Sequence, residues 1–187
     1  FANGGGISNS GTLTLTNSTL SDNEARSSVG GGIVNNGGTL TVIGSTLSGN
    51  SAIAGAGIFN NGGTLTITAS TISNNSTRSN GGGIVSVGGT VTVNASTLSN
   101  NAARGLGGGI INSGGTLTVT SSTFSGNSVR TMGGGIANSG TLTITNSTFS
   151  GNFTTDGAGG NLFNDTGASA YLRANVLSAG PSGGNCS

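Results

Sequence analysis

The sequence predicts an all-β chain wound as a single-stranded parallel β-helix, a solenoid of about seven coils of 25–26 residues with three short sides per coil. A phrase containing Gly-Gly-Gly-Ile, Gly-Thr-Leu-Thr and Ser-Thr-Leu-Ser-x-Asn recurs along the whole chain. Its short alternating runs of Thr, Val, Ile and Leu, separated by Gly and Asn, are typical of strands and turns. The apolar residue after the glycines returns at a nearly constant step, at Ile7, Ile33, Ile58, Ile84, Ile110, Ile136 and Leu162.

The length of the repeat favours a coil over other repeat architectures. A four-stranded propeller blade takes about 40 residues, more than this period provides. One turn of a parallel β-helix fits, because each strand then pairs with its equivalents in the coils above and below, about 4.8 Å away. Equivalent residues of successive phrases therefore stack on one another.

The first side of each coil follows the glycines. Glycine there indicates a bend, because it adopts positive φ and lets the backbone approach closely. The apolar residue after the glycines is the first inward position. Two residues later comes a column of amides whose stacking satisfies polar groups at a corner. This column contains Asn9, Asn35, Asn60, Asn112, Asn138 and Asn164, with Ser86 in the remaining coil.

The second side is the run that begins Thr12-Leu13-Thr14-Leu15. Side chains alternate across a strand, so Leu13 and Leu15 point into the coil and the threonines point outward. The inward pair recurs as Leu40/Val42, Leu65/Ile67, Val91/Val93, Leu117/Val119 and Leu142/Ile144. The outward threonines form two unbroken columns, at Thr12, Thr14, Thr39, Thr41, Thr64, Thr66, Thr90, Thr92, Thr116, Thr118, Thr141 and Thr143.

The third side carries one inward residue per coil, and a second amide column follows it. The inward positions are Leu20, Leu47, Ile72, Leu98, Phe124 and Phe149. The second amide column has no exception and contains Asn23, Asn50, Asn75, Asn101, Asn127 and Asn152. We expect both amide columns to form structural ladders at corners of the coil.

The whole chain, residues 1–187, is predicted to be one β-helix domain with coils starting near residues 4, 30, 55, 81, 107, 133 and 159. The last coil departs from the phrase at Tyr171, Arg173 and Pro181, as expected of a degenerate, cap-like coil. The chain opens in mid-phrase at Phe1, which predicts that further coils of a longer chain, or a second copy stacked head-to-tail, continue the solenoid there.

The composition leaves little material for chemistry. The chain has 39 glycines, 5% charged residues, a net charge of +1 and no Lys, His or Trp, and its only acids are Asp22, Glu24, Asp156 and Asp165. We therefore expect no catalytic residues, no cofactor and no metal site. Nucleic acid is not an expected partner, and no apolar run is long enough to span a bilayer. Cys186, the single cysteine, has no partner for an internal disulfide.

The phrase resembles known bacterial repeats. Gly-Gly-Gly-Ile together with Phe124-Ser125-Gly126-Asn127 and Phe149-Ser150-Gly151-Asn152 is similar to the GGA(I/L/V) and FxxN repeats of polymorphic outer-membrane proteins and autotransporter passengers. The longer phrase looks like the repeats of secreted bacterial β-helix proteins with a pectin-lyase-like fold. This resemblance implies a right-handed coil and a location at the bacterial cell surface or outside the cell. It covers nearly the whole chain but specifies a scaffold more than a function.

Three functional interpretations remain open from the sequence. The leading one is a non-catalytic extracellular structural or adhesive β-solenoid, such as a surface stalk, an adhesin passenger or a self-assembling filament subunit. The first alternative is an ice-binding protein that uses the outward Thr-x-Thr face, which resembles that of β-solenoid antifreeze proteins. The second is a polysaccharide-binding or polysaccharide-degrading β-helix. Its candidate anion contacts are arginines three residues after the second amide column, at Arg26, Arg78, Arg104 and Arg130.

Overall fold

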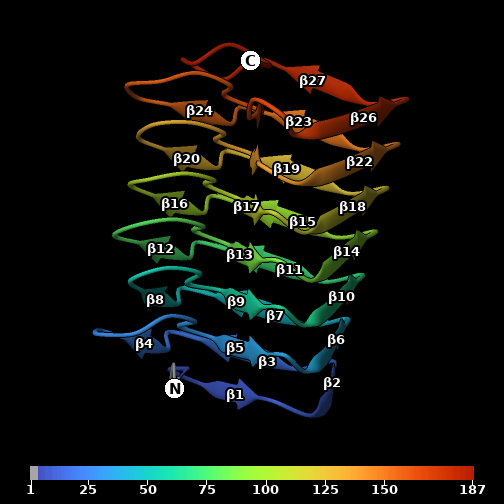
Figure 1. Cartoon of the computed structure of the whole chain (residues 1–187). Helices are drawn as coiled ribbons and strands as arrows, with labels where there is room; N and C mark the ends of the chain where they lie inside the picture. The colour runs from blue at the N-terminus through green and yellow to red at the C-terminus, as the bar shows by residue number, and fades with distance from the viewer. Residues whose placement is uncertain (1–3) are drawn as a thin grey trace.

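The computed structural model describes residues 4–187, and within this range every regular element is a β-strand. The strands stack as a β-solenoid of about seven coils (Figure 1). They form four parallel sheets along the rod, three of seven strands and one of six, which we call sheets A to D in chain order. Residues 4–187 include no helix of the length and apolarity needed to cross a membrane.

Sheets A and B form the first two sides of the coil. Sheet A follows the glycines and contains β1 (Ile7–Asn9), β5 (Ile33–Asn36), β9 (Ile58–Asn61), β13 (Ile84–Val87), β17 (Ile110–Ser113), β21 (Ile136–Asn138) and β25 (Leu162–Asn164). Sheet B is the Thr-Leu-Thr side and contains β2 (Thr12–Thr16), β6 (Thr39–Ile43), β10 (Thr64–Thr68), β14 (Thr90–Asn94), β18 (Thr116–Thr120), β22 (Thr141–Thr145) and β26 (Ser169–Arg173).

Sheets C and D complete the coil. Sheet C contains β3 (Thr19–Ser21), β7 (Thr46–Ser48), β11 (Thr71–Ser73), β15 (Thr97–Ser99), β19 (Thr123–Ser125), β23 (Thr148–Ser150) and β27 (Val176–Ser178). Sheet D contains two-residue strands, β4 (Glu24–Ala25), β8 (Ser51–Ala52), β12 (Ser76–Thr77), β16 (Ala102–Ala103), β20 (Ser128–Val129) and β24 (Phe153–Thr154). The prediction of three sides was therefore incomplete, because sheet D is a fourth short side after the second amide column.

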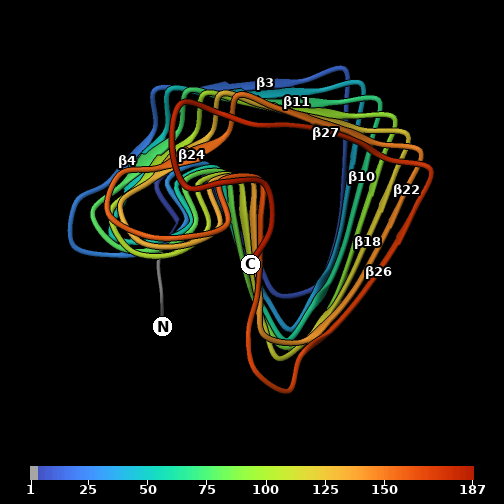
Figure 2. The same cartoon turned by 90° about the horizontal axis from the view of Figure 1, so that it is seen from above.

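Successive coils are stacked in register. In sheet B, Thr66 pairs with Thr92, and in sheet A, Ile84 pairs with Ile110, so identical or similar side chains lie above one another. Figure 2 looks down the axis from the C-terminal end of the rod. In this view the chain passes counterclockwise from sheet B through sheet C to sheet D while it rises toward the viewer, so the coil is right-handed.

The interior is a continuous aliphatic core. Its columns are the predicted inward residues, and in the middle coils side chains such as Leu65, Ile84 and Val93 are fully buried. Phe124 and Phe149 stack with their ring centroids 4.6 Å apart. Full burial of an aliphatic side chain stabilises the fold by about 1.5–3 kcal/mol. The columns therefore hold the coils together in addition to the backbone hydrogen bonds of the sheets.

A second apolar cluster lies outside sheet A, on the face opposite the main core. Val85, Ile111 and Ala137 project outward from β13, β17 and β21 and are at least 96% buried. They are covered because the loop between sheets D and A folds back over them and packs Ala54 and Leu106 against the cluster. These loops therefore form part of the packed structure, and they fix the surface beside sheet D.

The glycines before each first-side residue are required by close backbone contact. Gly107 has φ of 66°. Gly109 has an ordinary φ, but a Cβ built on it would lie 2.5 Å from the carbonyl oxygen of Gly135 in the next coil. A side chain at such a position would separate the two coils, since real Cβ atoms do not approach backbone oxygens so closely.

The two ends of the described rod differ. At the C-terminal end the tail adds to sheet A above β25, where Leu162 donates its N–H to the Asn185 carbonyl at 2.9 Å and Ser187 donates to Leu162 at 3.2 Å. Strands β26 and β27 are the last of sheets B and C among residues 4–187. At the other end, Leu13 and Leu15 are only partly buried, whereas their equivalents inside the rod are fully covered.

Candidate functional site

The first amide column lies at the corner between sheets A and B. Each amide Nδ2 donates to the Oδ1 of the next coil, at 2.7 Å from Asn9 to Asn35 and from Asn35 to Asn60, and at 2.8 Å from Asn112 to Asn138. Asn138 continues the column to Asn164 at 2.7 Å. The Nδ2 groups also donate to carbonyls of the adjacent turn, so one amide closes its own turn and joins two coils.

This first ladder is interrupted at Ser86. The Asn60 amide reaches the Ser86 hydroxyl at 3.5 Å, and that hydroxyl donates to the Gly88 carbonyl at 2.9 Å. Nothing then donates to Oδ1 of Asn112, which is buried without a hydrogen-bond partner. The shorter serine side chain therefore leaves one unsatisfied acceptor in the middle of the rod.

The second amide column runs without a break at the corner between sheets C and D. Asn75, Asn101 and Asn127 each donate Nδ2 to the next Oδ1, at 2.8–2.9 Å. The same Oδ1 atoms also accept from the backbone N–H of the preceding asparagine, at 3.0–3.1 Å. Each Nδ2 donates in addition to a sheet C carbonyl of the coil below. Every polar atom of these amides is satisfied although the side chains are fully buried.

Two residues extend the second ladder that the repeat pattern did not predict. Asn152 donates to Asn161 at 2.8 Å, and Asn161 donates to Asn185 at 2.9 Å. Asn161 stands where the earlier phrases have the last glycine before the apolar residue, and Asn185 lies in the tail. They were missed because they enter the column from other positions of the phrase.

A third ladder, which sequence reasoning missed, lies at the corner between sheets B and C. The backbone N–H of Ser45 donates to the Ser70 hydroxyl at 3.1 Å, while the Ser45 hydroxyl donates to the Ile43 carbonyl at 2.8 Å. The column consists of Ser18, Ser45, Ser70, Ser96, Ser122 and Ser147 and ends on Asn175. A serine precedes the first threonine of the third side in each of these repeats, and this recurring serine could have indicated the ladder from the sequence.

The outward threonines of sheet B lie in two straight columns. The column that starts at Thr12 is exposed in all six coils, and the column that starts at Thr14 is half-buried above the first coil. Each threonine pairs with a threonine of the next coil, as between β6, β10, β14 and β18. In the last coil Ser169 and Tyr171 continue the two columns. The spacing is about 6.7 Å along a strand and 4.8 Å between strands.

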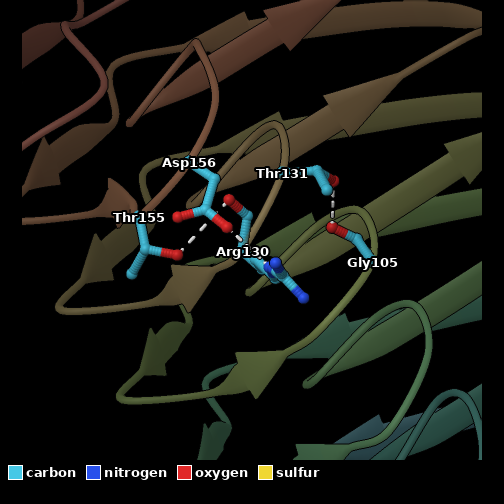
Figure 3. Close-up of polar contacts among 5 residues, drawn as sticks. All are labelled: Gly105, Arg130, Thr131, Thr155 and Asp156. Atoms are coloured by element: carbon cyan, nitrogen blue, oxygen red, sulfur yellow. Dashed lines mark hydrogen bonds and ion pairs between the residues drawn. The ribbon is translucent and has the colours of Figure 1, made fainter.

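The four candidate arginines are all exposed, but they are not equivalent. Arg26 Nε lies 2.9 Å from Glu24 Oε2, and Arg130 Nε lies 2.6 Å from Asp156 Oδ2 (Figure 3). Hydrogen bonding to Arg130 holds the pKa of Asp156 below its ordinary value, whereas Arg78 and Arg104 have no ion pair within residues 4–187.

The loops that carry the arginines are also not evenly stacked. The N–H of Ile53 pairs with the carbonyl of Ser28, and the N–H of Ser79 pairs with the carbonyl of Ile53. In the next loops Thr131 donates its hydroxyl to the Gly105 carbonyl (Figure 3). The arginine column read from the sequence, which Ile53 and Thr155 interrupt, is therefore shifted in part: Arg104 donates its N–H to the Ser79 carbonyl, whereas Arg130 donates to the Ala103 carbonyl in the regular register.

A groove of about 590 Å³ lies over sheet D, between these loops. Its floor is formed by β8 and β12, and its rim includes Arg26, Arg78 and Arg104. A smaller hollow beside sheet A, lined by Leu106, Ile111 and Phe163, is part of the outer apolar cluster. The groove is the larger of these two concave features.

The acidic residues are dispersed. Glu24 pairs with Arg26 in its own coil, Asp156 pairs with Arg130 of the neighbouring coil, and Asp165 accepts from the backbone N–H of Thr166. Among residues 4–187, no three side chains of His, Cys, Asp or Glu gather closely enough to hold a metal ion.

Comparisons of the chain with protein-family models, with curated proteins and with solved structures found no match.

Proposed function

We propose that this chain is a non-catalytic structural or adhesive β-solenoid that acts outside the bacterial cell or on its surface, as a stalk, an adhesin passenger or a filament subunit. The observation that carries the proposal is the set of side-chain ladders that run along the rod, two of them unbroken and one interrupted at Ser86. Three columns of polar side chains join the coils at three corners, in addition to four parallel sheets. Such a rod is suited to holding its two ends apart at a fixed distance.

The rod makes a rigid spacer because each coil contacts only its neighbours and repeats the same bonds. Seven coils at about 4.8 Å per coil give a length of about 34 Å. Further coils would lengthen such a rod by repeating the same contacts between neighbours. The resemblance of the glycine-rich phrase to surface and secreted bacterial repeats supports the proposed location.

Electron microscopy of the purified chain tests this role. Short straight rods are expected, and head-to-tail fibres at high concentration identify the filament subunit. Globular or flexible particles contradict the structural role. A parallel assay incubates the chain with a panel of acidic and neutral polysaccharides, and the appearance of new reducing ends or unsaturated products overturns the non-catalytic assignment.

Ice binding is the second candidate, and the registered threonine columns of sheet B favour it. Two columns with regular spacing in both directions present methyl and hydroxyl groups as a repeating array. Thermal hysteresis of the wild type is the required observation. If it is present, Thr66→Tyr on sheet B should reduce it strongly, while Thr71→Tyr on sheet C of the same coil should not. Absence of hysteresis in the wild type removes this candidate.

A further inference from the structure

The groove over sheet D exists because one loop is short. The segment from Asn50 to Gly55, which contains β8 and the loop after it, has one residue fewer than its equivalent from Asn75 to Gly81, and two fewer than that from Asn23 to Gly30. The loop of the second coil therefore projects less far than the loops of the first and third coils on either side of it. The hollow left there exposes Ser51 and Ser76 of the sheet D strands β8 and β12 as its floor.

The charge of this groove is positive. Arg26, Arg78 and Arg104 line it, against one carboxylate, Glu24, which is already paired with Arg26. Arg78 and Arg104 stand on neighbouring coils and make no ion pair in the described part of the chain. Two unpaired guanidinium groups beside one hollow attract an anion, and each presents a fork of N–H donors.

A buried hydroxyl on a residue that lines the groove lacks a partner. Thr77 is 92% buried in β12, lines the groove directly before Arg78, and its Oγ1 has no hydrogen-bond partner. Its equivalents in other coils are mostly aliphatic, such as Ala52 and Val129, or are satisfied, as Thr154 is by the Gly157 carbonyl at 2.9 Å. An unsatisfied buried hydroxyl is costly, but this oxygen is closed to solvent, so the arginines and the two serines are the polar groups that a ligand can reach.

The remaining lining restricts the type of ligand. The groove contains no aromatic side chain on which nucleobases stack, and its floor offers the Ser51 and Ser76 hydroxyls instead of an apolar anchor pocket. Its volume of about 590 Å³ falls within the range of about 300–1,000 Å³ typical of ligand sites. A hydroxyl-rich anionic chain fits this surface better than a nucleic acid or a hydrophobic peptide.

We propose that this groove is a binding site for a sulfated polysaccharide, with an ester sulfate held between Arg78 and Arg104. The guanidinium groups of Arg78 and Arg104, each a fork of N–H donors on its own coil, can surround the three terminal oxygens of a tetrahedral ester, whereas a carboxylate offers only two coplanar oxygens. The sugar hydroxyls lie over Ser51 and Ser76. The site is distinct from the threonine face and does not depend on the proposed structural role.

Binding is tested by calorimetric titration of the purified chain with dextran sulfate at low salt, with polygalacturonate, inorganic polyphosphate and neutral dextran as comparisons. We expect dextran sulfate to bind most tightly, and its affinity to fall as salt is added. Equal or tighter binding of polygalacturonate or polyphosphate overturns the assignment to a sulfated sugar. No binding of dextran sulfate overturns the site.

A charge-matched pair of variants separates a specific groove from general attraction. Arg78→Gln/Arg104→Gln removes both unpaired groups, and Arg130→Gln/Arg173→Gln removes the same net charge outside the groove. The first variant should weaken dextran sulfate binding by more than about tenfold, because charge-assisted hydrogen bonds are lost. The second variant should weaken it by less than about threefold, because only a screened long-range attraction is lost. Equal losses overturn the proposal. All four side chains are exposed, and circular dichroism checks that both variants remain folded.

Discussion

Replacement of Asn101 by alanine tests whether the amide ladder stabilises the rod. Asn101 is fully buried, and its side chain makes four hydrogen bonds. Its Oδ1 accepts from the backbone N–H and the Nδ2 of Asn75, at 3.1 and 2.9 Å. Its Nδ2 donates to the Ile72 carbonyl and to Asn127 Oδ1, both at 2.9 Å. Asn101→Ala removes all four bonds and leaves the buried Asn75 N–H without this acceptor.

The expected loss follows from these contacts. At about 1 kcal/mol net for each hydrogen bond, four bonds are worth about 4 kcal/mol, and an orphaned buried N–H alone costs about 1–3 kcal/mol. For a chain of this size each kcal/mol lowers the melting temperature by about 2–4 °C. We therefore expect the melting temperature of Asn101→Ala, followed by circular dichroism, to fall by about 8–16 °C.

Asn61→Ala is the matched control. Asn61 is exposed and makes one side-chain bond to the asparagine below it, from Nδ2 to Asn36 Oδ1 at 2.8 Å. Water replaces such a bond, so the control should shift the melting temperature by no more than about 2 °C. If Asn101→Ala is no less stable than Asn61→Ala, the ladder is not a source of stability and the reasoning fails.

Three other substitutions should have smaller effects. Ser86→Asn restores the donor missing at Asn112 Oδ1 and should raise the free energy of unfolding by about 1 kcal/mol; a decrease in urea denaturation would show that the turn has no room for an amide. Thr77→Val removes a buried hydroxyl without a partner and should also raise stability, by up to about 1 kcal/mol, and a lower urea midpoint would contradict this. Arg130 keeps the pKa of Asp156 low, so this pair stabilises the fold above the ordinary carboxyl pKa and the effect is lost as pH falls through the lowered value. Arg130→Gln should therefore raise the midpoint of Asp156 in an NMR titration, and an unchanged midpoint would mean that the ion pair does not form in solution.

The core of this fold was predictable because its signals repeat. Leu65, Ile67 and Ile72 occupy fixed places in the phrase, alternation assigns their faces, and all three are fully buried. The position of the fully buried Asn101 was predictable for the same reason, because an asparagine at this position of every repeat indicates a side chain that bonds to its neighbours.

The features that the sequence did not reveal arise between coils or from differences in loop length. Strand β12 has only two residues, Ser76 and Thr77, too few for alternation to be detected. The burial of Val85 on the outer face depends on a loop that folds over it. The groove depends on a single shorter loop, around Ile53, whose effect on the surface cannot be read from the repeat alone.

The amide columns give the rod a direction. In the second ladder every Nδ2, from Asn23 through Asn50 to Asn127, donates to the coil nearer the C-terminus. The amide dipoles therefore add along the axis, as peptide dipoles do in a helix. One end of the column presents amide oxygens and the other presents N–H groups. A second copy that prolongs the columns has to meet the first head-to-tail, because a twofold pairing would oppose like ends. Copies that prolonged the columns would consequently form open polar polymers with two chemically different tips, and a closed symmetric dimer would not continue the columns.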